Sequence, residues 1–174
     1  MFASRRLPKR IEVGIFRAMT FRRTFQAAAL TFALAYCATA FAQDIRSKFD
    51  PSRDAAKDVA AAVATAKAQG KRVIVDVGGE WCTWCHIMDR FVLSNADVNA
   101  LVDSNYVWVK VNFSRENKNE AVLAKWPTVK GYPHLFVLNA DGKMLHSQET
   151  GSLEAARDYD KGKFVAFLEK YGSK

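Results

Sequence analysis

Hydrophobic positions recur along this chain in two different patterns. In some segments they lie three or four residues apart, as on one face of a helix, and in others they form short continuous runs rich in β-branched side chains, as in a buried strand. The helical pattern predicts helices at residues 55–68, 82–91, 96–102, 116–125 and 161–171. The continuous runs predict strands at residues 73–77, 106–113, 134–138 and 143–148. Gly70 is expected to end the first helix, and Gly142 to supply the positive φ of a tight turn at residues 139–142.

The order of these elements predicts an α/β fold. Strands separated by helices imply parallel pairing with right-handed crossovers, whereas the last two strands, joined by a tight turn, form an antiparallel hairpin. Residues 151–160 are interpreted as a polar connection to the closing helix. We therefore expect a small central mixed β-sheet flanked by helices, with a C-terminal β-hairpin plus helix, in one domain without repeats.

The charge of the chain is concentrated at its start. The 174 residues carry a net charge of +8, and residues 1–42 hold seven Lys and Arg against one Glu. Residues 43–174 are left with a net charge of +2. Bulk attraction to a polyanion needs a strongly basic surface, so no nucleic acid is expected as a partner.

Residues 1–42 have the organisation of a secretory signal peptide. Two arginines precede an uncharged, alanine-rich stretch that ends in Ala40-Phe41-Ala42, with small residues where signal peptidase cleaves. A retained membrane anchor is the alternative, which the low hydrophobicity of Ala and Thr disfavours. Because the leader is long for a signal, translation from Met19 would give a more ordinary length. Cleavage after Ala42 would leave residues 43–174 as a periplasmic or secreted domain.

Cys82 and Cys85 are the two cysteines that follow the leader. A bridge across C-x-x-C closes too short a loop to stabilise a fold much, so this pair needs another explanation. Cys82 follows a strand and opens a helix, where unpaired N–H groups and the helix dipole stabilise a thiolate. We therefore expect Cys82 to be exposed, with a lowered pKa, and to be the nucleophile. Cys85, one turn further in, is expected to be buried and to resolve the mixed disulfide.

The run D-x3-E-W-C-x-x-C at residues 76–85 resembles the active site of thioredoxin in order and spacing. The likeness extends over residues 73–143, and the mature chain is similar to exported members of the thioredoxin family. The resemblance implies a thioredoxin fold in which Asp76 is the buried acid that assists proton transfer at the resolving cysteine. It also implies that Pro133 is a cis-proline facing the disulfide and that Lys110 lies near the buried acid.

The chain departs from thioredoxin inside this motif. Thr83-Trp84 stands between the cysteines where thioredoxin has Gly-Pro, and the form C-x-W-C-H is similar to a bacterial thioredoxin-like subgroup of poorly defined role. Because this dipeptide sets the redox potential, the reducing potential of thioredoxin cannot be transferred to this chain. Gly78-Gly79 stands where thioredoxin has bulkier residues, and we expect it to make room for Trp84.

Residues around the cysteines have both functional and structural interpretations. His86, on the helical face of Cys82, would lower the pKa of that thiol as an imidazolium, or would only cap the helix or contact solvent. Trp81 and Trp84 are candidates for substrate contacts or for packing. The backbone of Tyr132 would pair with an extended substrate peptide.

The same holds for the polar residues of the strands. Asp76 would transfer protons, because a buried carboxyl has a raised pKa, or would be a satisfied structural residue at a strand end. Lys110 would support Asp76, or would lie solvated on the face of the sheet. His134 and His146 are expected to be structural.

These observations favour a periplasmic thiol–disulfide oxidoreductase, and Asp76 favours a reductase or isomerase over an oxidase. Its partners would be proteins that bear thiols or disulfides, together with a membrane electron donor or acceptor. The chain has no dinucleotide-binding or P-loop motif. We therefore expect no cofactor beyond the redox-active disulfide, no metal, and a monomer.

Two other functions remain open at this point. A copper(I) metallochaperone would use Cys82, Cys85 and His86, with Met88 as a further soft ligand nearby. A non-catalytic adaptor would keep the thioredoxin fold only for binding. The intact cysteine pair, Asp76 and Pro133 argue against an adaptor, which could have lost them.

Overall fold

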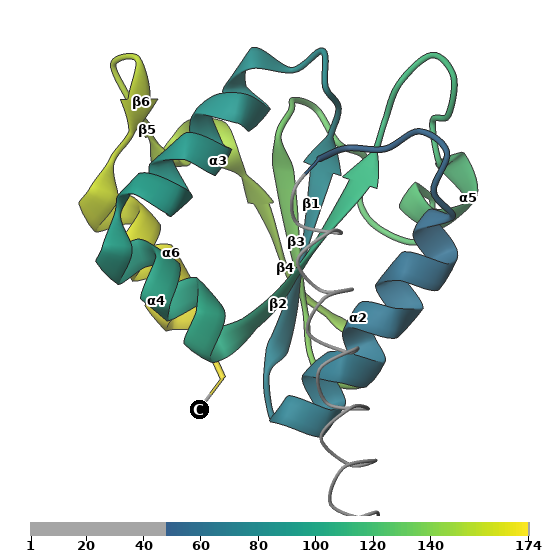
Figure 1. Cartoon of the computed structure of the whole chain (residues 1–174), viewed down its shortest axis with the longest axis horizontal. Coiled ribbons are helices and arrows are strands. Elements are labelled where there is room, and N and C mark those ends of the chain that lie inside the picture. The colour runs from purple at the N-terminus through teal and green to yellow at the C-terminus, as the bar shows by residue number, and fades with distance from the viewer. Residues whose placement is uncertain (1–47, 174) are drawn as a thin grey trace, which may run out of the picture. The chain divides into compact units, whose positions relative to one another are not determined.

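A four-stranded sheet with helices on both faces forms the centre of the computed structural model, which describes residues 48–173 (Figure 1). The strands are β1 (Arg72–Gly78), β2 (Tyr106–Asn112), β3 (His134–Leu138) and β4 (Met144–Glu149), in the order β2-β1-β3-β4. The helices are α2 (Ala55–Gln69), α3 (Thr83–Ser94), α4 (Ala96–Asn105), α5 (Glu120–Leu123) and α6 (Lys161–Tyr171). The expected α/β fold, with its mixed sheet and its closing hairpin and helix, is confirmed.

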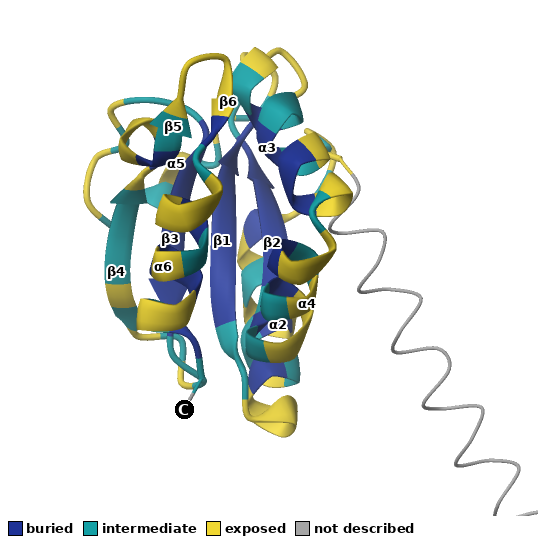
Figure 2. Ribbon diagram, turned by 90° about the vertical axis from the view of Figure 1, so that its left-hand side faces the viewer, coloured by how far each residue is buried: buried dark blue, intermediate teal, exposed yellow. Residues whose placement is uncertain are grey.

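Strand β1 is central, and its two faces are buried against different helices (Figure 2). Ile74 belongs to the core cluster that also includes residues of α3, α4 and α6. Val73, Val75 and Val77 belong to the cluster that includes residues of α2. A strand buried on both faces explains the continuous apolar run that predicted it, and Asp76 interrupts this run.

Helix α2 is capped at both termini. The side chain of Asp54 accepts hydrogen bonds from the backbone N–H groups of Ala56 and Lys57, and Gly70 ends the helix with φ 66°. Gly142 also has a positive φ, 78°, in the turn between β3 and β4. These local signals confirm the predicted helix at residues 55–68 and the predicted hairpin turn.

The expectation of parallel pairing is correct for β1 and β2 and wrong for β3. Strand β1 pairs parallel with β2 but antiparallel with β3, and His134 at the start of β3 lies opposite Val77 near the end of β1. The connection between β2 and β3, residues 113–133, contains only the four-residue helix α5 and no helix that runs the length of the sheet. It is therefore not the helical crossover that parallel pairing usually uses, and β3 pairs antiparallel with β1.

The predicted helix at residues 116–125 shrinks to α5 because asparagine side chains compete for the backbone. The backbone N–H of Asn119 donates to Oδ1 of Asn117 at 3.1 Å, and Nδ2 of Asn119 donates to the carbonyl of Asn112 at 2.7 Å. Asn119 itself takes a left-handed conformation with φ 49°. Such local hydrogen bonds offer the chain an alternative to a helix, so the helix begins only after Asn119.

The connection before α6 is more ordered than expected. It contains a 3₁₀ turn (Thr150–Leu153) and a two-stranded hairpin of β5 (Glu154–Ala155) and β6 (Asp158–Tyr159). Leu153 and Tyr159 are buried in the core beside α3 and α6, which explains why this polar segment is ordered. The expected signal peptide and the Met19 start lie outside the described residues. Within residues 48–173, no helix is both long and apolar enough to cross a membrane.

Candidate active site

Cys82 and Cys85 form a disulfide at the N-terminus of α3, with their Cα atoms 5.3 Å apart. Cys82 is the N-cap residue of α3, and its Sγ accepts a hydrogen bond from the backbone N–H of Cys85 at 3.1 Å. The same N–H group and the positive end of the helix dipole would stabilise a negative charge on this sulfur in the reduced form. The position supports Cys82 as the thiolate of the pair.

The expected exposure of Cys82 is wrong for the disulfide form. Cys82 is 4% exposed and Cys85 is fully buried. The two cysteines form a small apolar cluster with Phe49, against which Trp84 and Tyr132 pack. These aromatic side chains cover the disulfide, and of the two cysteines Cys82 alone keeps a contact with solvent.

Asp76 is fully buried in β1, as the resemblance implied. Its Oδ2 accepts a hydrogen bond from Nε1 of Trp108 at 3.2 Å, whereas its Oδ1 has no partner among residues 48–173. Burial raises the pKa of Asp76 from 3.8 to about 7, against the opposing effect of the Lys110 ammonium, while the Asp89 carboxylate raises it further. A carboxyl with this pKa can both accept and release a proton near neutral pH.

Lys110 lies beside Asp76 in the register of β1 and β2. It is buried, so the alternative of a solvated lysine on the sheet face is wrong. Its Nζ donates a hydrogen bond to Oδ2 of Asp89 at 2.5 Å and lies 4.3 Å from the ring centroid of Phe49. Sequence reasoning missed Asp89, although its position one helical turn after Cys85 on α3 is a usable signal.

Trp81 is a surface residue beside the disulfide, with 56% of its area exposed. Its Nε1 donates to the carbonyl of Phe113 at 2.7 Å, and its ring meets the ring of Tyr132 edge-on at 5.5 Å. Tyr132 in turn stacks on Phe113 at 5.0 Å. Trp81 also lines a cleft of about 530 Å³ with Phe113, Ser114, Arg115, Glu116 and Lys118. An exposed indole that lines a cleft is available for substrate contact.

Trp84 is half-buried and packs both against the cysteine cluster and against the larger core cluster. Its ring meets the ring of Tyr159 edge-on at 5.6 Å and packs against the core beneath α3. The expectation that the two glycines make room for Trp84 is wrong. A Cβ on Gly78 would overlap Sγ of Cys85, and a Cβ on Gly79 would overlap the indole of Trp81. These glycines therefore allow the backbone to approach the disulfide and Trp81.

His86 is linked to the loop before the disulfide. Its Nε2 lies 2.9 Å from the carbonyl oxygen of Glu80 and 4.0 Å from Oε2 of the same residue. His134 is buried and its ring bonds to Oγ of Ser147 at 2.8 Å, and the ring of His146 stacks on Tyr171 at 4.1 Å. His134 and His146 thus make the structural contacts expected of them.

The copper alternative finds no support in this geometry. Within residues 48–173, no group of three or more His, Cys, Asp and Glu is placed to hold a metal ion. Met88, the further soft ligand considered, is fully buried in the core cluster with Ile74.

The peptide bond between Tyr132 and Pro133 is cis. The carbonyl of Pro133 accepts a hydrogen bond from Oγ1 of Thr150 at 2.6 Å, which ties this loop to the turn after β4. Tyr132, Pro133 and Thr150 also line a hollow of about 290 Å³. Tyr132 therefore lines this hollow and contacts Trp81 and Phe113, which line the other cleft.

The mixed sheet has the strand order β2-β1-β3-β4, and its central strand β1 leads into a helix with C-x-x-C at its N-terminus. This arrangement defines the thioredoxin class of folds. A family model described as thioredoxin-like matches residues 54–140. The chain belongs to this thioredoxin-like family.

Curated relatives resemble this region. The thiol:disulfide interchange protein DsbD of Colwellia psychrerythraea is 31% identical over 96 residues, which are 54% of this chain and 16% of that protein. DsbD of Salmonella typhimurium is 32% identical over 95 residues, which are 53% of this chain and 16% of that protein. The chain thus corresponds to a small part of the length of these relatives.

Solved structures resemble the fold over most of the described residues. The disulphide isomerase from Xylella fastidiosa Temecula1 has a TM-score of 0.61 and 27% identity, and the match covers 70% of this chain and 94% of that chain. The oxidised C-terminal domain of DsbD from Neisseria meningitidis has a TM-score of 0.54 and 22% identity, covering 72% of this chain and 99% of that chain. The second likeness supports the fold.

Proposed function

We propose that this domain is a thiol–disulfide oxidoreductase that acts on proteins as a reductase or isomerase. The observation that carries the proposal is the Cys82–Cys85 disulfide at the N-terminus of α3, which follows the strand that holds the buried carboxyl of Asp76 with its raised pKa. The names of the matched DsbD proteins and of the Xylella disulphide isomerase support the same class of reaction.

In the reductase direction, the first step is attack by the Cys82 thiolate on a substrate disulfide. A bond forms between Sγ of Cys82 and one substrate sulfur, and the other substrate sulfur leaves as a thiolate. The backbone N–H of Cys85, 3.1 Å from Sγ of Cys82, and the N-terminus of α3 stabilise the attacking charge.

The second step releases the substrate and oxidises the protein. The Cys85 thiol gives its proton to the Asp76 carboxylate, and its sulfur attacks Sγ of Cys82. The substrate sulfur leaves as a thiolate and takes up a proton, so the substrate has gained two electrons and the Cys82–Cys85 disulfide has formed. An isomerase cycle shares the first step, after which a second substrate thiolate displaces Cys82 with no net electron transfer.

The surroundings of the disulfide suggest how a protein substrate would bind. Trp81 is exposed beside Cys82, Tyr132 lines one hollow, and its ring contacts Trp81 and Phe113, which line a second. We propose that an extended substrate segment lies along the Tyr132–Pro133 backbone, with side chains directed into these hollows.

The proposed activity also suggests where the domain acts and with which partners. We propose that the leader exports the domain to the periplasm and that it acts there as a monomer, with no cofactor beyond its disulfide. A reductase in an oxidising compartment must itself be reduced, and a membrane-bound dithiol donor would supply two electrons and two protons per turnover.

Trapping of substrates tests the proposal. A Cys85→Ala variant expressed in its native compartment should accumulate mixed disulfides between Cys82 and client proteins, because the resolving step is removed. A Cys82→Ala variant is the matched control and should trap none. If Cys85→Ala traps no more protein than Cys82→Ala, the domain is a binding adaptor and the proposal is wrong.

A further inference from the structure

Phe49 comes from the segment before α2, which lies across the sheet at the ends of β1 and β2 (Figure 1). Its side chain is 1% exposed and packs with Cys82 and Cys85. The Nζ of Lys110 lies 4.3 Å from its ring centroid. The ring of Phe49 thus separates the resolving cysteine and a buried ammonium from solvent.

The place of this ring is explained by Gly78. A Cβ on Gly78 would lie 3.0 Å from Cζ of Phe49 and would overlap Sγ of Cys85. The space that a side chain of residue 78 would take in β1 is therefore filled by Phe49, from a segment distant in sequence. The cover over Cys85 is part of the N-terminal segment and not of the strand beneath the disulfide.

Glu80 holds the backbone of Phe49 directly. Its Oε1 accepts a hydrogen bond from the backbone N–H of Phe49 at 2.7 Å, although the two residues are 31 positions apart. Glu80 lies two residues before Cys82 in the active-site motif. A residue of the active-site loop, Glu80, therefore holds in place the segment whose Phe49 ring covers the disulfide.

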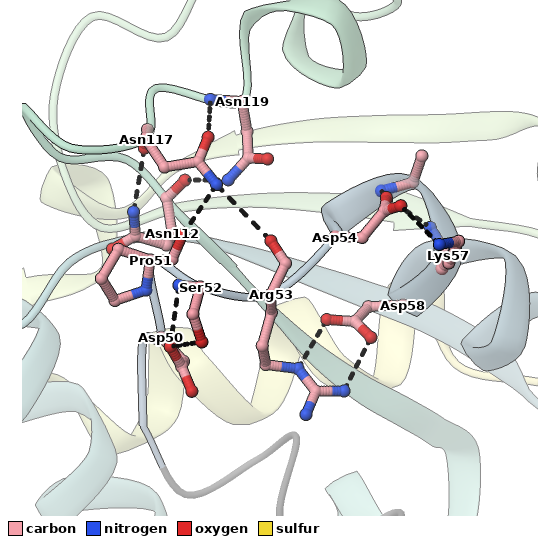
Figure 3. A network of polar contacts seen from close by, with 11 residues as sticks. Asp50, Pro51, Ser52, Arg53, Asp54, Lys57, Asp58, Asn112, Asn117 and Asn119 are labelled. Carbon is pink, nitrogen blue, oxygen red and sulfur yellow. Dashed lines mark hydrogen bonds and ion pairs between the residues drawn. The ribbon is translucent and has the colours of Figure 1, made fainter.

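A polar network holds the residues that follow Phe49 (Figure 3). Nδ2 of Asn117 donates to the carbonyl of Pro51 at 2.9 Å. Arg53 makes two hydrogen bonds of 2.7 Å to the carboxylate of Asp58 on α2. The segment that carries the ring is thus tied to the loop after β2 and to the first turn of α2.

We propose that Phe49 is a positioning residue for thiol–disulfide exchange, which it directs to Cys82 by covering the sulfur of Cys85. This inference rests on the proposed function. An incoming thiolate forms a bond to one sulfur of the pair, and the other sulfur leaves as a thiolate. Attack on Cys82 expels the buried Cys85 as the leaving thiolate. Attack on Cys85 would expel Cys82 as the thiolate and leave the mixed disulfide on the buried Cys85 instead of on Cys82.

The test is the site of attack by reduced glutathione on the oxidised, exported protein. Short reactions are quenched with acid, and tandem mass spectrometry of the peptide that holds both cysteines assigns the glutathione adduct. The wild type should carry it on Cys82. Phe49→Ala should carry a comparable share on Cys85, and Phe49→Leu, which keeps an apolar cover, should restore selectivity for Cys82.

Two controls separate the cover from general stability. Phe164→Ala removes a buried ring from the core cluster beside α6 and should leave the adduct on Cys82. Glu80→Ala removes the acceptor for the N–H of Phe49 without opening a core cavity, and should also give adduct on Cys85. Glu80→Gln keeps an acceptor oxygen for this N–H and should give adduct on Cys82 alone. The Glu80 pair decides the question even if Phe49→Ala does not fold.

The outcomes distinguish the two proposals. If adducts on Cys85 remain absent in both Phe49→Ala and Glu80→Ala, the role of Phe49 is overturned while the oxidoreductase proposal stands. If Phe164→Ala redirects the adduct as much as Phe49→Ala, general loosening explains the effect and the inference is wrong. If reduced glutathione does not reduce the disulfide of the wild type at all, the proposed function itself fails.

Discussion

The raised pKa of Asp76 makes the stability of the oxidised protein depend on pH in a way that one substitution removes. Burial raises this pKa from 3.8 to about 7. Below pH 3.8 the carboxyl is neutral in both the folded and the unfolded chain, so its burial as an ion does not lower the free energy of unfolding. Between pH 3.8 and 7 the unfolded chain ionises first, and the folded state loses stability as the pH rises; above about 7 the loss is complete.

The magnitude follows from the two pKa values. A difference of about 3, at about 1.36 kcal/mol per pH unit, gives a loss of about 4 kcal/mol by pH 7 to 8. Asp76→Asn should escape this loss, because its amide is neutral at every pH. The amide oxygen can keep the bond from Nε1 of Trp108, and the NH₂ group would lie where Oδ1 already has no partner among the described residues.

Urea unfolding of the oxidised protein between pH 4 and 9 measures this effect. The free energy of unfolding of Asp76→Asn minus that of the wild type should be near zero at pH 4 and should rise to about 4 kcal/mol at pH 8. Asp141→Asn, which alters an exposed carboxyl, serves as the matched control. Parallel pH curves for the wild type and Asp76→Asn would refute the reasoning, because Asp76 would then ionise alike in both states.

Three further substitutions test the packing around the site by urea unfolding. Gly78→Ala should destabilise the oxidised protein, since its Cβ would overlap Sγ of Cys85; an unchanged midpoint would show that the strand can move away. Thr150→Val should cost about 1–3 kcal/mol, because the buried carbonyl of Pro133 loses its donor, and a change within experimental error would mean that another donor replaces it. Asp54→Ala should cost about 1 kcal/mol through loss of the α2 cap, whereas Asp54→Asn should retain most of the stability.

The elements with strong local signals could be predicted from the sequence. The alanine-rich stretch closed by Gly70 became α2, and the apolar run that contains Asp76 became β1. In each case the propensity of the segment and its burial favour the same structure. The direction of β3 and the length of α5 could not be predicted in this way. The length of α5 depends on the side-chain hydrogen bonds of Asn117 and Asn119, and the direction of β3 depends on its pairing with β1, a strand distant in sequence.

The site was predictable where a motif carried it and unpredictable where distant segments meet. The spacing around Cys82 and Cys85 located the disulfide and the buried Asp76. The burial of Cys82 was not foreseen, because it depends on rings from other segments. The role of Phe49 could not be predicted, because a single aromatic residue in a polar stretch forms no hydrophobic pattern. Its hydrogen-bond partner Glu80 lies 31 residues away in the sequence.

The reduction potential of the Cys82–Cys85 pair tests the central claim most directly. Equilibration in glutathione buffers can be followed by tryptophan fluorescence, since Trp81 and Trp84 flank the disulfide. A reductase or isomerase should equilibrate reversibly, with a potential nearer to the ~−270 mV of thioredoxin than to the ~−120 mV of a strong oxidant. A value near ~−120 mV would contradict the assigned direction of electron flow, and a pair that does not exchange with glutathione would contradict the oxidoreductase itself.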